Sequence, residues 1–203
     1  MKINNEDWSK WLDEYKYQDS LSKKLENYKG EFDQNTINEI VLWKTNRYAD
    51  ISSMDSNIKL LDVINSIDPL WTVNEYNENF TREVISKLLA IDGIRLAMAS
   101  TILRFRNPKI YQILDQRVYR FLLNQNYELP LTKGNKIPDN NANESAETYV
   151  VYLAKLKHFC TEHNVSFSES DKVLYLVDKK VGKEKLGQKN TFRNFDDYKI
   201  VIQ

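Results

Sequence analysis

The chain has 203 residues, of which 41% are hydrophobic and 29% are charged, so it carries enough apolar side chains for a folded core. Only five glycines and four prolines occur, and this scarcity of turn-forming residues excludes a turn-dense β-sandwich or propeller and favours a helical fold. The 29 lysines and arginines balance the 29 aspartates and glutamates, so net charge does not indicate a polyanionic partner, and any basic surface must be local.

The cysteine content and the N-terminal segment indicate the cellular compartment in which the protein is expected. Cys160 is the single cysteine, which excludes an internal disulfide and, by itself, cannot hold a zinc ion or an iron–sulfur cluster. Residues 1–15 lack the basic and apolar regions of a signal peptide, and no run approaches the roughly 18 apolar residues of a membrane span. We therefore expect one domain over residues 1–203, in the cytoplasm, with no membrane partner.

Hydrophobic spacing predicts three helices in the first third of the chain. Two helical patterns fall within residues 6–48, the second with Thr36 as its N-cap. A third helix is predicted around Leu60–Ile64, and it ends near Asp68 because the following proline disfavours helical geometry there. Residues 71–79 are expected to form a connecting loop.

A pair of helices joined by a glycine turn is predicted at about residues 81–106. The first helix contains Val84–Leu89, the turn spans Ile91–Ile94, and the second helix begins near Leu96. Beyond this pair, Asp115 stands where a further helix would start.

The last part of the chain alternates between polar and periodic segments. Residues 125–143 are polar, with two prolines and a glycine, and predict the longest exposed loop. Tyr149–Cys160 carries the strongest helical period of the chain and predicts a core helix. Ser168–Asp171 resembles a capping box for a last helix, and residues 198–202 fit either a short strand or a frayed tail.

The segment from residue 88 to 120 combines an apolar helix end, a glycine hairpin, a helix of small and apolar residues, and an aspartate that opens the next helix. The residues that carry this pattern are Leu89, Ile91, Gly93, Ile94, Ala99, Asp115, Val118 and Arg120. The pattern resembles the motif of the helix-hairpin-helix DNA glycosylase superfamily, in particular its 8-oxoguanine and endonuclease III branches. The resemblance implies an all-α fold with an active-site cleft between two helical subdomains. It also implies double-stranded DNA as the partner and a monomer associated with the nucleoid.

Asp115 is the expected catalytic residue. A carboxylate at a helix N-terminus is held ionised by the helix dipole, so it can stabilise a cationic transition state. The resemblance implies that this cation is the sugar formed when an N-glycosidic bond is cleaved, with Asp115 also orienting water. The alternative is that Asp115 only caps a helix.

The same segment predicts DNA contacts. Backbone N–H groups at a glycine hairpin bind phosphate, and six basic residues against one acidic residue from Arg95 to Arg120 give a local positive excess. The expected DNA-binding residues are Gly93, Arg95, Ala97, Arg104, Arg106, Arg117 and Arg120. The alternative is an ordinary solvated charged face.

Two positions differ from the superfamily motif. Arg95 stands where a second hairpin glycine is common, so the phosphate-binding turn is either altered or supplemented by a guanidinium. Ala97 stands where the bifunctional branches place a Schiff-base lysine, which implies a monofunctional enzyme. The resemblance implies no cofactor, apart from a monovalent cation held by hairpin carbonyls, and the single cysteine excludes the four-cysteine cluster.

Lys44 lies in the middle of the apolar stripe of the helix that follows Thr36. Burial would lower the pKa of its amine and make it a better nucleophile, so Lys44 is a hypothetical substitute for the missing lysine, with lyase activity as the consequence. The alternative is a buried stem whose head pairs with a carboxylate.

An enzyme that extrudes a base needs aromatic walls and polar groups around it. The expected base-pocket residues are Trp43, Arg47, Tyr48 and Trp71, and the alternative for the aromatic ones is an ordinary place in the core.

These features favour a DNA glycosylase that flips a damaged or modified base and cleaves its N-glycosidic bond in base-excision repair. A second hypothesis retains DNA binding without catalysis, as a helix-hairpin-helix module in a repair or phage-defence assembly. A third is a helical interaction protein with no nucleic-acid role.

Overall fold

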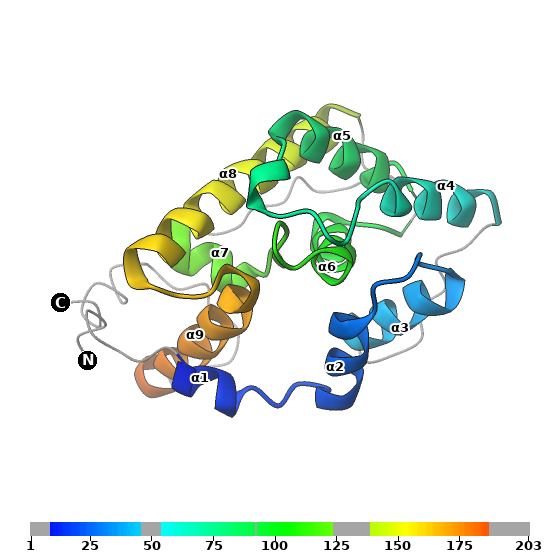
Figure 1. Ribbon diagram of the computed structural model, residues 1–203. Helices are drawn as coiled ribbons and strands as arrows, with labels where there is room; N and C mark the ends of the chain where they lie inside the picture. The colour runs from blue at the N-terminus through cyan, green and yellow to red at the C-terminus, as the bar shows by residue number, and fades with distance from the viewer. Residues whose placement is uncertain (1–8, 46–53, 92, 124–138, 187–203) are drawn as a thin grey trace.

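The computed structural model describes residues 9–45, 54–91, 93–123 and 139–186. Over these ranges the chain forms helices joined by loops and contains no strand, which confirms the predicted all-α class (Figure 1). The α-helices are α1 (Ser9–Glu14), α2 (Asp19–Asn27), α3 (Gln34–Thr45), α4 (Met54–Asn65), α5 (Glu78–Leu89), α6 (Leu96–Arg106), α7 (Gln116–Leu123), α8 (Asp139–His163) and α9 (Ser170–Leu186). None of the helices in the described ranges is long and apolar enough to cross a membrane.

Helix α6 is the centre of the fold, where Figure 1 shows it almost end-on. Helices α2, α3, α4 and α5 all pack against it, and its side chains are buried along almost its whole length. The small residues Ala99 and Ser100 are fully buried, and side chains of this size allow neighbouring segments to approach the helix closely.

The predicted helical hairpin is present as α5, a tight turn and α6. Asn77 caps α5 by accepting a hydrogen bond from the backbone N–H of Phe80 at 2.9 Å. In the turn, Gly93 has a φ of 85°, a left-handed conformation that glycine adopts at little cost. The hairpin prediction is therefore confirmed, with its glycine at the position that requires one.

The N-terminal segment contains more helix than its sequence pattern predicted. Between the two predicted helices lies α2, whose residues are mostly polar but which buries Leu25 against neighbours α3 and α6. The N-cap prediction for α3 is wrong, because the Asp33 carboxylate accepts hydrogen bonds from the backbone N–H of Thr36 at 2.8 Å and from its hydroxyl at 2.7 Å. Asp33 therefore caps this helix in place of Thr36.

Helix α8 is the long element that packs against α5 and α7. It begins at Asp139, so residues 139–143 are helical and the predicted loop 125–143 is wrong over that part, while residues 125–138 lie outside the described ranges. The predicted core face of Tyr149–Cys160 is confirmed by burial.

Two short 3-10 helices modify the predicted connections. One, η2 (Val73–Glu75), lies inside the predicted loop 71–79, and α5 already begins at Glu78. The other, η3 (Phe167–Glu169), precedes α9, so Ser168 belongs to that turn and is not the cap of α9. The predicted tail at residues 198–202 lies outside the described ranges.

Candidate functional site

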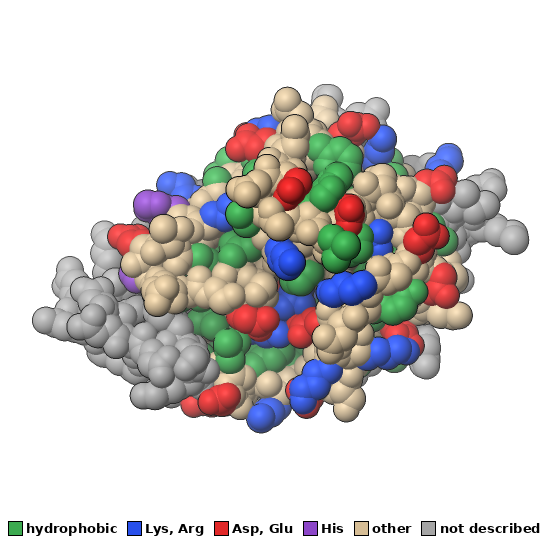
Figure 2. Space-filling model, viewed as in Figure 1, with side chains coloured by type: hydrophobic (Ala, Val, Ile, Leu, Met, Phe, Trp, Pro, Cys, Tyr) green, Lys and Arg blue, Asp and Glu red, His purple; other side chains and the backbone are tan. Residues whose placement is uncertain are grey.

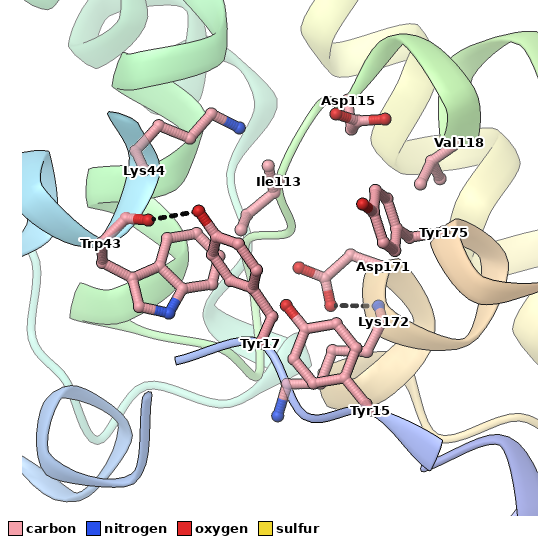
Figure 3. A pocket seen from close by; sticks show the side chains of 10 residues that line it. All are labelled: Tyr15, Tyr17, Trp43, Lys44, Ile113, Asp115, Val118, Asp171, Lys172 and Tyr175. Atoms are coloured by element: carbon pink, nitrogen blue, oxygen red, sulfur yellow. Dashed lines mark hydrogen bonds between the residues drawn. The ribbon is translucent and has the colours of Figure 1, made fainter. Parts of the chain in front are cut away.

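A pocket of about 220 Å³ opens between two sides of the helical fold. One side consists of α3 and the connection between α1 and α2, and the other consists of the α6–α7 connection, α7 and α9. The residues that line it are Tyr15, Tyr17, Trp43, Lys44, Ile113, Asp115, Val118, Asp171, Lys172 and Tyr175 (Figure 3). The two predicted catalytic residues, Lys44 and Asp115, therefore lie in one pocket although distant parts of the chain supply them.

Asp115 lies at the end of the connection between α6 and α7, whose last residues, 111–115, belong to no helix or turn. Three hydrogen bonds fasten this segment to α6 and α8: Tyr149 Oη to Gln112 O (2.9 Å), Tyr152 Oη to Ile113 O (2.6 Å) and Leu114 N to Ser100 Oγ (3.0 Å). All three are buried, and bonds of this kind are costly to break because they leave unsatisfied polar groups. The core thus fixes the backbone from which Asp115 extends.

Asp115 also caps α7, as predicted. Its carboxylate accepts a hydrogen bond from the backbone N–H of Arg117 at 2.8 Å, and its carbonyl accepts one from Tyr119 at 2.9 Å. The side chain is half-buried at the edge of the pocket, at the positive end of the helix dipole. This geometry favours a carboxylate whose orientation is fixed before any ligand arrives.

Lys44 reaches the pocket from the last turn of α3. In Figure 3 its amine extends across the pocket toward the side that carries Asp115. Burial lowers the pKa of the Lys44 amine, and the carboxylates of Asp115 and Asp171 oppose that change without cancelling it. An amine with a lowered pKa has a larger neutral fraction, and the neutral form is the nucleophile.

Trp43 forms an aromatic wall of the pocket and is held rigidly. Its indole Nε1–H donates to Ser22 Oγ at 2.7 Å, and its ring packs edge-on against Phe105 at 5.0 Å and against Tyr17 at 5.2 Å. The hydroxyl of Tyr17 donates to the carbonyl of Trp43 at 2.9 Å. Trp43 is therefore both a core aromatic and a pocket residue, so the two alternatives given for it, a pocket wall and a place in the core, are compatible.

Comparisons with protein-family models, with curated proteins and with solved structures find no match to this chain. A functional assignment therefore depends on the residues of the pocket and of the hairpin. Within the described ranges, no group of three or more histidine, cysteine, aspartate or glutamate side chains is arranged to hold a metal ion.

Several pocket residues were not predicted, and α9 supplies the most important of them, Asp171. This residue was assigned to a helix cap, yet its carboxylate points into the pocket in Figure 3. Burial raises the pKa of Asp171, while the neighbouring Arg104 and Lys172 lower it in part. The spacing of Asp171 and Tyr175 places both on one face of the helix, and this was the one available signal in the sequence.

Two of the predicted DNA-binding arginines are wrong assignments, because they are internal. Arg104 is 1% exposed and forms ion pairs with Glu26 at 2.7 Å and Asp171 at 3.6 Å. Arg106 is 4% exposed and donates to the carbonyls of Ile67 at 2.8 Å and Gly30 at 2.6 Å. These guanidiniums hold elements of the fold together and do not face a DNA backbone.

The remaining basic residues form no continuous patch on the face seen in Figure 2, where basic and acidic side chains are interspersed over the described residues. Arg95 is exposed at the start of α6, beside the exposed Gly93, and Ala97 is half-buried in the first turn. Arg117 is 42% exposed but forms an ion pair at 2.8 Å with the buried Asp178.

Of the predicted base-pocket residues, Trp43 lines the pocket and Trp71 does not. Trp71 packs edge-on against Phe80 of α5 at 5.7 Å instead. Arg47 and Tyr48 lie outside the described ranges, as does the side chain of Arg120.

Proposed function

We propose that this protein is a DNA glycosylase of the helix-hairpin-helix type, with its active site in the pocket between α3, α7 and α9. The single observation that carries the proposal is the meeting of Asp115, Lys44 and the Trp43 ring in one pocket. A carboxylate, an amine of lowered pKa and an aromatic wall are the groups that base extrusion and N-glycosidic cleavage require.

Asp115 is the central group in this proposal. As the bond between C1′ of the sugar and the base nitrogen breaks, its electron pair leaves with the base and positive charge develops on the sugar. The Asp115 carboxylate stabilises that charge. Water then adds to C1′, Asp115 accepts the proton that this water releases, and the departing base is protonated by solvent.

Lys44 offers a second route from the same pocket. Its neutral amine attacks C1′ and displaces the base, and opening of the sugar ring then gives a protonated imine between C1′ and Nζ, with O4′ taking a proton. Hydrolysis of the imine regenerates the amine, whereas elimination of the 3′ phosphate from it cleaves the strand. Lys44 thereby replaces the lysine that Ala97 does not supply.

DNA is held at the hairpin in this proposal. The exposed Gly93 and Arg95 stand at the N-terminus of α6, where backbone N–H groups lack helical partners and the helix dipole favours an anion. A phosphate bound there is fixed by the backbone and by one guanidinium.

The first experiment measures base release from lesion-containing DNA by wild type and by Asp115→Asn. Asparagine is as good an N-cap as aspartate, so it retains the bond to Arg117 while removing the charge. We expect release to fall about 100-fold or more because the charge that stabilises the transition state is lost.

The matched control is Asp33→Asn, which makes the same change at the N-cap of α3, outside the pocket. It should retain wild-type release. Undiminished release by Asp115→Asn would contradict the proposed catalytic role, and salt-dependent DNA binding with no base released by any variant would favour the non-catalytic module.

The second experiment tests the amine by borohydride reduction, which converts an imine between protein and DNA into a stable adduct. Wild type should form the adduct, and Lys44→Met should not. The control is Lys172→Met, since Lys172 is the other lysine of the pocket but its Nζ is held by ion pairs with Glu26 at 2.7 Å and Glu169 at 2.8 Å. Equal trapping by Lys44→Met and wild type would exclude Lys44 as the nucleophile.

A further inference from the structure

Asp171 is a buried carboxylate placed at a ligand pocket. Its side chain is 6% exposed, yet it lines the cavity, and Figure 3 shows one of its oxygens directed into the space between Lys44 and the tyrosines of the α1–α2 connection. Charged side chains are almost never buried without a partner. The partners of Asp171 therefore indicate which of its oxygens can bind a ligand.

The two oxygens of Asp171 are held differently. Oδ1 accepts a hydrogen bond from the backbone N–H of Lys172 at 2.8 Å. Oδ2 lies 3.6 Å from Arg104 Nε, a distance that gives charge compensation but exceeds a normal hydrogen bond. Oδ2 therefore keeps hydrogen-bonding capacity toward the cavity, and each carboxylate oxygen has two lone pairs.

Arg104 is itself fixed, which makes the orientation of Asp171 rigid. Its Nη1 lies 2.7 Å from Glu26 Oε1, and its Nη2 donates to the carbonyl of Ser168 at 3.1 Å. A carboxylate held in this way is an acceptor whose position and charge are set before a ligand enters. Preorganised acceptors discriminate strongly between ligands because no adjustment compensates for a missing donor.

Oδ2 of Asp171 accepts hydrogen bonds and does not donate them, and its two lone pairs can accept from two adjacent N–H donors. Among the nucleobases, the guanine edge presents such a pair in N1–H and the 2-amino group. Adenine and cytosine present one amino group beside a ring-nitrogen acceptor, and uracil and thymine present one N–H between two carbonyl acceptors that repel a carboxylate. The donor pattern therefore distinguishes guanine-derived bases from the others.

The dimensions of the pocket suit a bicyclic base. A cavity of about 150 Å³ holds benzene, and the pocket here is larger, at about 220 Å³. Trp43 and Tyr17 on one side and Tyr175 on the other provide aromatic surfaces on which a purine can lie.

We propose that Asp171 is the specificity-determining residue of this pocket and that it selects guanine-derived bases by accepting hydrogen bonds from N1–H and the 2-amino group. This inference rests on the proposed glycosylase function and names its substrate class. Asp171 acts on the base edge, whereas Asp115 and Lys44 act on the sugar.

The test uses pairs of oligonucleotide duplexes whose modified bases differ only in the 2-amino group. The pairs are 8-oxoguanine with 8-oxohypoxanthine, and 7-methylguanine with 7-methylhypoxanthine, with 5-hydroxyuracil as a pyrimidine. Wild type should release the guanine member of at least one pair about ten- to a hundred-fold faster than its hypoxanthine partner, the discrimination expected when one hydrogen bond to a charged acceptor is lost.

In the variant Asp171→Asn the amide oxygen can keep the bond from the Lys172 backbone N–H, which leaves the amide NH₂ group facing the cavity, where it opposes the N–H donors of guanine. We expect the ratio within that pair to fall toward one, because the guanine member loses its advantage. Binding of DNA that carries a tetrahydrofuran abasic analogue, which has no base to read, should stay within about two-fold of wild type and so reports that the variant is folded. If the variant does not fold, the wild-type ratio still tests the proposal, because a ratio of one in every pair overturns it.

Equal release of both members of each pair by wild type would overturn the role of Asp171 while leaving the glycosylase function intact. Preferential release of 5-hydroxyuracil would do the same. Release of no base from any duplex would remove both the proposed function and this inference.

Discussion

Replacing Arg104 with methionine is expected to destabilise the fold without weakening the proposed DNA contact, although the sequence alone places this residue among the expected DNA-binding arginines. The guanidinium is 1% exposed and lies between three acceptors on other elements: Glu26 Oε1 at 2.7 Å, Asp171 Oδ2 at 3.6 Å and the carbonyl of Ser168 at 3.1 Å. Methionine fills much of the same volume but leaves the buried Asp171 carboxylate without its ion-pair partner, while Glu26 keeps its ion pair with Lys172 at 2.7 Å.

The magnitude follows from the burial of this ion-pair network. Removing one partner of a buried pair costs about 3–5 kcal/mol, because an uncompensated charge remains in the interior. In a domain of this size each kcal/mol lowers the melting temperature by about 2–4 °C, so a decrease of about 6–20 °C is expected. The exposed Arg95 provides the control, since an exposed charged contact contributes about 1 kcal/mol or less.

The assay combines thermal unfolding with DNA affinity measured against salt concentration at a temperature where each variant is folded. Arg95→Met should reduce the slope of the logarithm of affinity against the logarithm of salt by about one, as for loss of a single phosphate contact. Arg104→Met should leave that slope unchanged, and adding Asp171→Asn should recover at least about 1 kcal/mol of stability. Wild-type stability of Arg104→Met together with a reduced salt slope would refute the internal role.

Three further substitutions test other parts of the structure. Gly93→Ala places a side chain in open space but at a φ of 85°, so we expect the free energy of unfolding to fall by about 1–2 kcal/mol. Urea titration should show a lower midpoint with an unchanged slope, and an unchanged midpoint would contradict the turn geometry. Ser22→Ala removes the 2.7 Å acceptor of the buried Trp43 indole N–H and should cost about 1–3 kcal/mol in the same titration, whereas a neutral result would show that this bond does not hold the pocket wall. Burial raises the pKa of Glu26, but Arg104 and a neighbouring lysine lower it to a net value below the ordinary 4.5. The stabilisation that ionised Glu26 gives to the fold is therefore present above pH 4.5 and lost as the pH falls through the lowered pKa. The loss of unfolding free energy caused by Glu26→Gln should be largest at neutral pH and smaller in acid. A loss that does not change with pH would contradict this.

The local features of the hairpin could be predicted from sequence because each depends on neighbouring residues. Periodic apolar positions define α5 and α6, a single glycine marks the turn, and Asp115 marks the start of α7. Lys44 was also identifiable as a candidate nucleophile, since its place on the apolar stripe of α3 follows from helical geometry alone. The all-α class and the candidates Asp115 and Lys44 were thus determined by sequence.

Only the tertiary structure decided which candidates lie together and which face the interior. Arg95 and Arg104 are the same residue type in one helical segment, yet one is exposed and the other is buried against α2 and α9. In the same way, the packing of α3 against α6 and of α7 against α9 brings Lys44, Asp115 and Asp171 around one cavity. Periodicity and capping report contacts within a few residues, whereas burial, ion pairing and the shape of a pocket depend on segments that meet only when the chain has folded.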